Sequence, residues 1–176
     1  MQQNKQTARA TRATLERETM QTITVNLYLF SELSDDAKQN AIGEIRYRYE
    51  FAWSDESLDS IKTFCDYFNV KLKSYEVDSC TFDYSHDATN ENFRGIKLSS
   101  INRDHMPTGY GLDCDLWMTF YDEFKRTGSA LKAFNDALYA GFKAWRNDIE
   151  WQLSDEHLSE YAEANEYQFT ENGSIY

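Results

Sequence analysis

The sequence has few residues that interrupt regular structure, and it has no long apolar run. Only 1 proline and 7 glycines occur among 176 residues, which argues against a linker-rich or low-complexity chain. No apolar stretch approaches the ~20 residues of a membrane span, and no apolar segment follows the basic N-terminus as in a signal peptide. The 3 cysteines are odd in number and widely spaced. These absences favour a reduced protein in the cytoplasm over a disulfide scaffold.

Positive charge is also scarce, and the deficit is uneven along the chain. The formal net charge is -12. Residues 1–19 contain four basic and two acidic residues, whereas the remaining residues contain 14 basic and 28 acidic ones. Such an excess of negative charge destabilises a folded chain through self-repulsion. We therefore expect a positively charged partner that offsets this repulsion. Without a basic stripe, the chain is not expected to bind nucleic acid directly.

Apolar side chains are plentiful, so the acidity does not indicate disorder. Hydrophobic residues make up 41% and aromatic residues 15% of the chain, which is enough for a core. The length suits one domain, which we place at residues 20–176. Residues 1–19 offer only Leu15 as a large apolar side chain after Met1. We interpret them either as a flexible basic arm that touches a partner or as a non-native extension before a natural start at Met20.

Alternation of apolar and polar residues predicts several strands. Residues 22–30 alternate most clearly and are expected to form a half-buried strand. Its expected inner face consists of Ile23, Val25, Leu27 and Leu29. Weaker alternation predicts strands at 70–78 and 79–84 and a short one at 94–98. The dipeptide Asn172-Gly173 is the strongest short hairpin signal, so residues 167–176 are expected to form a closing hairpin.

Helical spacing of apolar residues predicts four helices, each beginning after a serine that caps its first turn. The expected capping residues are Ser34, Ser54, Ser129 and Ser154. Residues 113–126 fit a helix through Phe120 and Phe124, but their first half also alternates like a strand. The expected class is α+β: a small, mostly antiparallel sheet packed with about four to five helices, and a C-terminal β-hairpin.

No catalytic or metal-binding constellation stands out. Histidines and acids gather in two polar stretches, which hold Asp83, His86, Asp87, Asp104 and His105. A metal site needs three or four converging ligands, and these spacings match no zinc or calcium loop. Cys114 lies between two aspartates that raise a thiol pKa, so we expect it to pack rather than react. We therefore expect no metal and no cofactor, and we keep a small enzyme that uses the 85–111 loops as a second alternative.

Acidic side chains at helical spacing form two rows. Carboxylates three or four residues apart lie ~5–6 Å apart on one helix face, whereas duplex DNA shows one negative charge per ~1.7 Å of axis. The first row consists of Asp155, Glu156, Glu160, Glu163 and Glu166. The second row consists of Asp55, Glu56 and Asp59. Such rows can imitate a phosphate track and occupy the groove of a nucleic-acid-binding protein; the alternative is a solvated helix face.

Both ends of the chain resemble a family of small phage and prophage proteins. The first segment, residues 27–42, reads LYLFSELSDDAKQNAI, and the second, residues 164–176, reads ANEYQFTENGSIY. Family members usually begin near the equivalent of Met20, which leaves residues 1–19 outside the resemblance. The resemblance implies an origin in a phage or mobile element. Some members carry an antitoxin label, and no catalytic residues come with the family.

Phage origin and an acidic body together suggest a function. The leading hypothesis is a non-enzymatic inhibitor of a host defence complex, most plausibly an anti-CRISPR protein, in the cytoplasm of the host cell. It would bind a basic nucleic-acid groove on a CRISPR effector or restriction complex through the two acidic rows, with aromatic side chains as anchors. The alternative is an antitoxin or regulator that neutralises a basic toxin.

Overall fold

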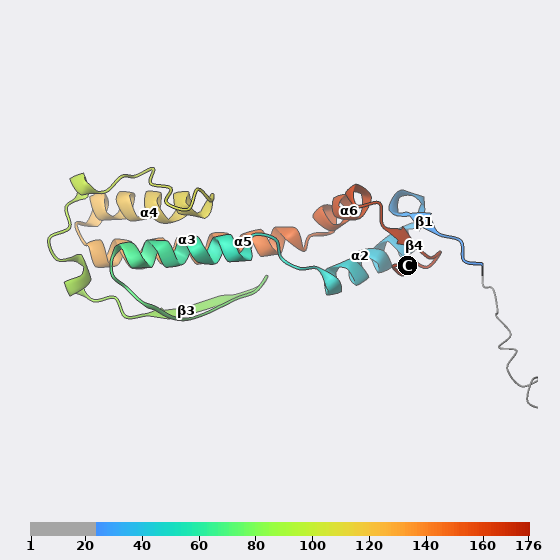
Figure 1. Cartoon of the computed structure of the whole chain (residues 1–176), viewed down its shortest axis with the longest axis horizontal. Coiled ribbons are helices and arrows are strands. Elements are labelled where there is room, and N and C mark those ends of the chain that lie inside the picture. The colour runs from blue at the N-terminus through green and yellow to red at the C-terminus, as the bar shows by residue number, and fades with distance from the viewer. Residues whose placement is uncertain (1–23) are drawn as a thin grey trace, which may run out of the picture.

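The computed structural model describes residues 24–176 and shows an elongated molecule with two hydrophobic cores (Figure 1). The expected arm at residues 1–19 lies outside the described residues, as does the beginning of the strand expected at 22–30. None of the helices in the described part is both long enough and apolar enough to cross a membrane.

The large core is built by three helices and one hairpin. The helices are α3 (Ser54–Tyr67), α4 (Leu112–Thr127) and α5 (Ala130–Gln152), and the hairpin pairs β2 (Leu72–Val77) with β3 (Phe82–His86) in antiparallel fashion. Two short 3-10 helices, η2 (Asn90–Phe93) and η3 (Leu98–Ser100), lie in the loop before α4. Fully buried aromatic side chains fill this core: Phe64, Phe68, Trp117, Phe120, Phe134 and Phe142. Burying each stabilises the fold by about 1.5–3 kcal/mol.

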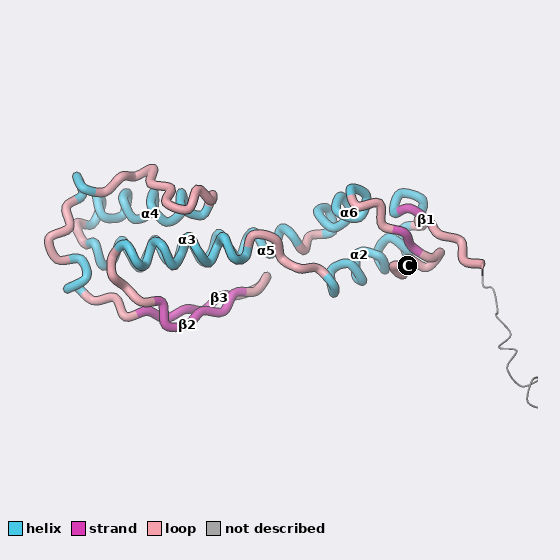
Figure 2. The backbone as a smooth tube through the Cα atoms, in the orientation of Figure 1, coloured by secondary structure: helices cyan, strands magenta, loops and turns pink. Residues whose placement is uncertain are grey.

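The small core joins the two ends of the described chain. It contains β1 (Tyr28–Leu29), η1 (Phe30–Glu32) and α2 (Asp35–Arg48) from one end, and α6 (Asp155–Ala164) and β4 (Gln168–Phe169) from the other. β1 and β4 pair antiparallel, with Tyr28 opposite Phe169. Figure 2 shows α2, α6 and these strands together, apart from the hairpin of the large core. The residues of the large core are thus inserted in the sequence between the two segments that form the small core.

The expected α+β class is confirmed. Residues 24–176 form five α-helices and antiparallel strand pairs, and the chain ends in a strand pair. The strands form two separate two-stranded sheets, β1–β4 and β2–β3, where one sheet was expected. The reason is that each pair packs against the helices of its own core. The closing hairpin turns at Gly173, which has a φ of 87°, and the Thr170 N–H donates to the Ser174 C=O at 2.9 Å.

The expected helix caps are confirmed at three of four positions. The hydroxyl oxygens of Ser34, Ser129 and Ser154 accept hydrogen bonds from the backbone N–H groups three residues later, at 3.2–3.3 Å. The expectation for Ser54 is wrong, because Ser54 is already the first helical residue. The residue before it, Trp53, turns the chain into α3 in the left-handed conformation, with a φ of 65°.

Strand length was predicted less well. The strand expected at 22–30 pairs only at Tyr28–Leu29 among the described residues, because its partner β4 offers only two residues. The expected inner face is also wrong, since the Val25 and Leu29 side chains are exposed and Phe30 is buried. No strand forms at 94–98. The ambiguous segment 113–126 is helical, within α4.

Candidate functional site

The first acidic row lies on the exposed face of α6. Leu158 and Ala162 are buried and fix the orientation of this helix against α2. All five carboxylates of the row are exposed: Asp155, Glu156, Glu160, Glu163 and Glu166. The first four lie within α6, whereas Glu166 follows the helix in a left-handed conformation, with a φ of 51°. The structure therefore places most of the row on one continuous helical surface.

Most of this row is not neutralised by neighbouring cations. Asp155 forms an ion pair with Arg46 of α2, and the Arg46 Nε–H also donates to the Leu153 C=O at 3.0 Å. Within residues 24–176, no ion pair reaches the four glutamates of the row. These four carboxylates therefore remain available to a positively charged partner.

The second acidic row lies at the beginning of α3, which belongs to the large core. Asp55, Glu56 and Asp59 are exposed, and in the part of the chain that the structure describes none of them has an ion-pair partner. Figure 1 shows α3 and α6 on opposite sides of the junction between the two cores. The two rows are thus separate surfaces, and the chain does not join them into one helical track.

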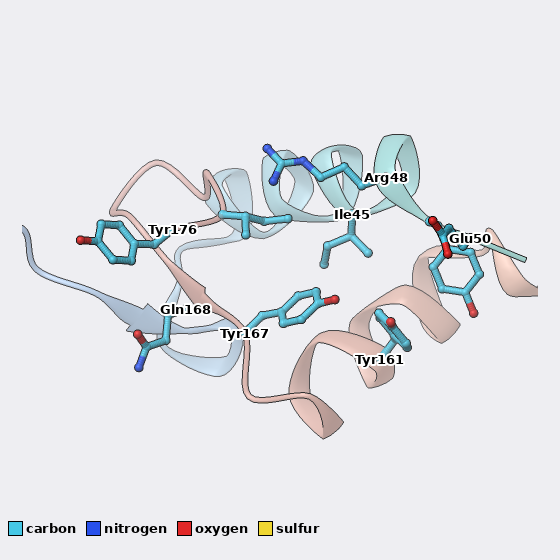
Figure 3. A pocket seen from close by; sticks show the side chains of 9 residues that line it. Ile45, Arg48, Glu50, Tyr161, Tyr167, Gln168 and Tyr176 are labelled. Atoms are coloured by element: carbon cyan, nitrogen blue, oxygen red, sulfur yellow. The ribbon is translucent and has the colours of Figure 1, made fainter. Parts of the chain in front are cut away.

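A cavity lined by tyrosines lies beside α6 in the small core (Figure 3). Its volume is about 400 Å³, and α2, α6 and the closing hairpin surround it. The rings of Tyr161 and Tyr167 lie below Ile45, with centroids 5.8 Å apart, and Tyr49 lies 5.2 Å from Tyr161. Arg48 lines the edge and is 3.2 Å from Glu44. This lining has the size and the mixed apolar and polar character to bind and orient a side chain of a partner.

The hydroxyls of Tyr49 and Tyr167 in this cavity have raised pKa values and stay protonated near neutral pH. Burial raises the pKa of Tyr49, whose hydroxyl lies 3.0 Å from the His157 Nε2. The hydrogen bond to Tyr161 is the main cause that raises the pKa of Tyr167, followed by burial. These hydroxyls therefore act as hydrogen-bond partners rather than as acids.

The histidines and acids singled out in the polar stretches take part in local structure. The His86 Nδ1 accepts the Ala88 N–H at 3.2 Å, and burial lowers the pKa of its ring. The Asp87 carboxylate accepts the Lys71 N–H at 2.7 Å. The His105 ring packs edge-on against Trp117. Among residues 24–176, no group of three or more His, Cys, Asp or Glu side chains could hold a metal ion.

The cysteines differ in burial. Cys65 is buried in the large core, and burial raises its pKa to about 12. Cys80 is exposed, and Cys114, which was expected to be buried, is half-buried at the beginning of α4. Next to it, Asp113 is fully buried and accepts hydrogen bonds from the Thr108 N–H, the Thr108 hydroxyl and the Gly109 N–H at 2.9–3.1 Å. The sequence pattern did not indicate that Asp113 would be buried and would bind the loop before α4.

Sequence reasoning also missed the junction between the cores. Gln152, the last residue of α5, is buried, and its side-chain amide both accepts from the Ala52 N–H at 3.0 Å and donates to the Ala52 C=O at 3.2 Å. Around this pair, Phe51, Trp53 and Trp151 are exposed. One signal was present: Trp151 lies outside the helical stripe of α5 that is buried through residues 145, 149 and 152.

Comparison with known proteins gives no relative: no family model, no curated protein and no solved structure matches the chain.

Proposed function

We propose that this protein is a non-enzymatic, phage-encoded inhibitor of a host defence complex and, more specifically, an anti-CRISPR protein. It binds a basic nucleic-acid groove of its target through acidic side chains on its surface. The observation that carries the proposal is the exposed row on α6, in which four glutamates have no ion-pair partner among residues 24–176.

Electrostatics explains why such a row suits an inhibitor. Carboxylates attract a basic groove over a long range, so they raise the association rate with the target and exclude wrong partners. The overall charge of -12 adds to this field. Because salt screens exposed charges, the affinity is expected to fall as the ionic strength rises.

Phage origin is supported by the resemblance at the two ends of the chain. The two segments that carry the resemblance, 27–42 and 164–176, are far apart in the sequence but meet in the small core. They supply the first turns of α2, the β1–β4 pair and the closing hairpin. Both segments thus lie in the small core, whose other buried residues, Ile45, Leu158 and Ala162, fall outside the resemblance.

The test is capture of the target from a host lysate by the tagged full chain, at low and at high salt. The variant Glu156→Lys/Glu160→Lys/Glu163→Lys reverses three exposed charges of the row. A matched control reverses three other exposed acids without ion pairs, Asp66, Glu76 and Asp83. Both variants change the net charge equally.

A nucleic-acid-binding defence subunit is expected to bind the wild type, to elute with salt, and to bind the α6 variant at least about tenfold more weakly. The control variant is expected to bind within about threefold of the wild type. It changes the net charge as much as the α6 variant does but leaves the carboxylates of α6 in place. An equal loss of target binding in both variants would contradict the proposal, because it would mean that the interaction depends only on net charge. Capture of a small basic toxin would instead support the antitoxin alternative.

A further inference from the structure

Three large aromatic side chains are exposed at the junction between the cores. Phe51 is 40%, Trp53 is 59% and Trp151 is 55% exposed, and we call these three residues the junction patch. Exposed aromatic groups of this size, gathered at one place, are typical of interaction sites. None of the three is needed to fill either core.

Contacts with neighbouring residues bring the patch together. The Gln152 side chain bonds to both the N–H and the C=O of Ala52. Trp53 follows Ala52 in the chain and Trp151 precedes Gln152, so both tryptophans lie close to this contact. On the other side, the Trp151 ring is 4.3 Å from the His157 ring. Tyr49 in turn lies 5.9 Å from His157 and 6.2 Å from Phe51. Aromatic contacts thus link Trp151 to Phe51.

The backbone at Trp53 is strained. Its φ of 65° places a bulky residue in the left-handed region, which residues other than glycine, asparagine and aspartate rarely adopt. No side-chain cap compensates for this at the beginning of α3. A glycine would adopt the same turn freely, but the chain places a tryptophan there and exposes it. Strain of this kind concentrates at functional sites.

Exposed carboxylates surround the patch. Glu50, Asp55 and Glu56 flank the Phe51–Trp53 segment, and Glu156 follows Trp151 and Gln152, next to Asp155, which is already paired with Arg46. The patch therefore repels a second copy of this acidic chain and attracts a cation. Of the two cationic side chains, arginine suits it better, because the planar guanidinium stacks on an aromatic ring while bonding to carboxylates, whereas lysine acts as a point charge.

We propose that the junction patch is the anchor of the binding surface, on which Trp53, Trp151 and Phe51 stack against arginine side chains of a basic protein partner. This proposal rests on the proposed function for the sign of the partner's charge. It adds that the partner is recognised through arginine, and that the contact lies at the junction between the two cores, with one acidic row on either side of it.

The test uses octa-arginine and octa-lysine peptides as probes of the full chain. Binding is followed by calorimetry and by acrylamide quenching of tryptophan fluorescence. Because Trp117 and Trp145 are buried, quenching reports mainly on Trp53 and Trp151. Octa-arginine is expected to bind about fivefold more tightly than octa-lysine and to protect the tryptophans from acrylamide.

The decisive variants are Trp53→Gly and Trp151→Ala. Each is expected to weaken octa-arginine binding about threefold to fivefold and to change octa-lysine binding less than about twofold. Trp53→Gly is expected to melt at the same temperature as the wild type or higher, because glycine removes the strain. The control is Tyr139→Ala, since Tyr139 is also 55% exposed on α5 but lies about 18 Å along the helix from Trp151.

Equal affinity of the wild type for both peptides, or unchanged octa-arginine binding in both tryptophan variants, overturns this proposal. Self-association of the wild type would also overturn it, since the patch would then bind a second copy. The outcome is separate from that of the proposed function. If the α6 variant loses target capture and both tryptophan variants keep it, the junction patch is not the anchor, whereas the proposed inhibitor function stands.

Discussion

Gly173 shows how much a single residue contributes to joining the two ends of the chain. A Cβ at this position would lie 2.0 Å from the Ala37 carbonyl oxygen of α2, so only glycine lets the closing hairpin approach that helix. The neighbouring Asn172 C=O accepts a hydrogen bond from the Asn40 side chain at 3.2 Å. The obstructing atom belongs to the backbone, which cannot rotate away as a side chain would.

We therefore expect Gly173→Ala to lower the free energy of unfolding by more than about 3 kcal/mol, from the combined overpacking and positive φ. Gly128→Ala is the matched control, because Gly128 also has a positive φ, 71°, but a Cβ there meets nothing within 4 Å. That control is expected to cost about 1–2 kcal/mol. Urea unfolding measures both, and equal losses would show that the close approach to Ala37 does not matter.

At the scale of elements, the β2–β3 hairpin contains a residue that makes stability depend on pH. Burial lowers the pKa of His86, the nearby Asp87 opposes this shift and Lys73 adds to it. The ring packs edge-on against Phe134 of α5, and its Nδ1 accepts the Ala88 N–H, which requires that nitrogen to be unprotonated. Because the folded pKa is below the unfolded value of about 6.5, the unfolded chain binds the proton more readily.

The contribution of His86 to stability is therefore complete above pH ~6.5 and is lost as the pH falls through its folded pKa. We expect the melting temperature of the wild type to fall over this range, and His86→Gln to fall less steeply. Melting curves at a series of pH values measure this. Parallel curves for the two proteins would mean that His86 does not couple to folding. Above pH 7 the difference between them should be constant.

Elements with strong local signals were predictable, and elements defined by their partners were not. Ser34, Ser129 and Ser154 specify helix beginnings within the next turn, so short sequence windows were sufficient. The strand expected at 22–30 depended on the length of β4, about 140 residues away. Similarly, segment 113–126 is a helix because it packs along α5, where Leu116 comes within contact distance of Gly141.

For the whole molecule, Gln152 connects the two cores. Its side chain makes three hydrogen bonds, two to the Ala52 backbone and one to the Asp148 carboxylate at 2.7 Å. We expect Gln152→Ala to lower the free energy of unfolding by about 2 kcal/mol, because it leaves the Ala52 N–H and C=O without these partners. Gln168→Ala, at an exposed position, serves as the control. Urea unfolding measures the free energy of unfolding of both variants. An unchanged unfolding curve would contradict this role.

The candidate site was predictable only where helical spacing decides exposure. The carboxylates of α6 were expected to form one exposed row from their helical spacing, and the burial of Leu158 and Ala162 on the opposite face agrees with this. Exposure of Phe51 and Trp53 depends on a turn between the cores, and no periodic pattern describes it. Whether the acidic rows and the junction patch bind a partner stays a prediction.

The sharing of the small core between the two ends of the chain also determines when it can form during protein synthesis. Phe30 and Ile42 emerge from the ribosome early, whereas Leu158 and Phe169, which complete their core, are made more than 100 residues later. At about 5–20 residues per second, the about 140 residues between Tyr28 and Phe169 take roughly 7–30 s to translate. During this interval the nascent chain holds one half of an apolar surface uncovered. Chaperones and proteases of the cell have that time to act on it before the second half arrives.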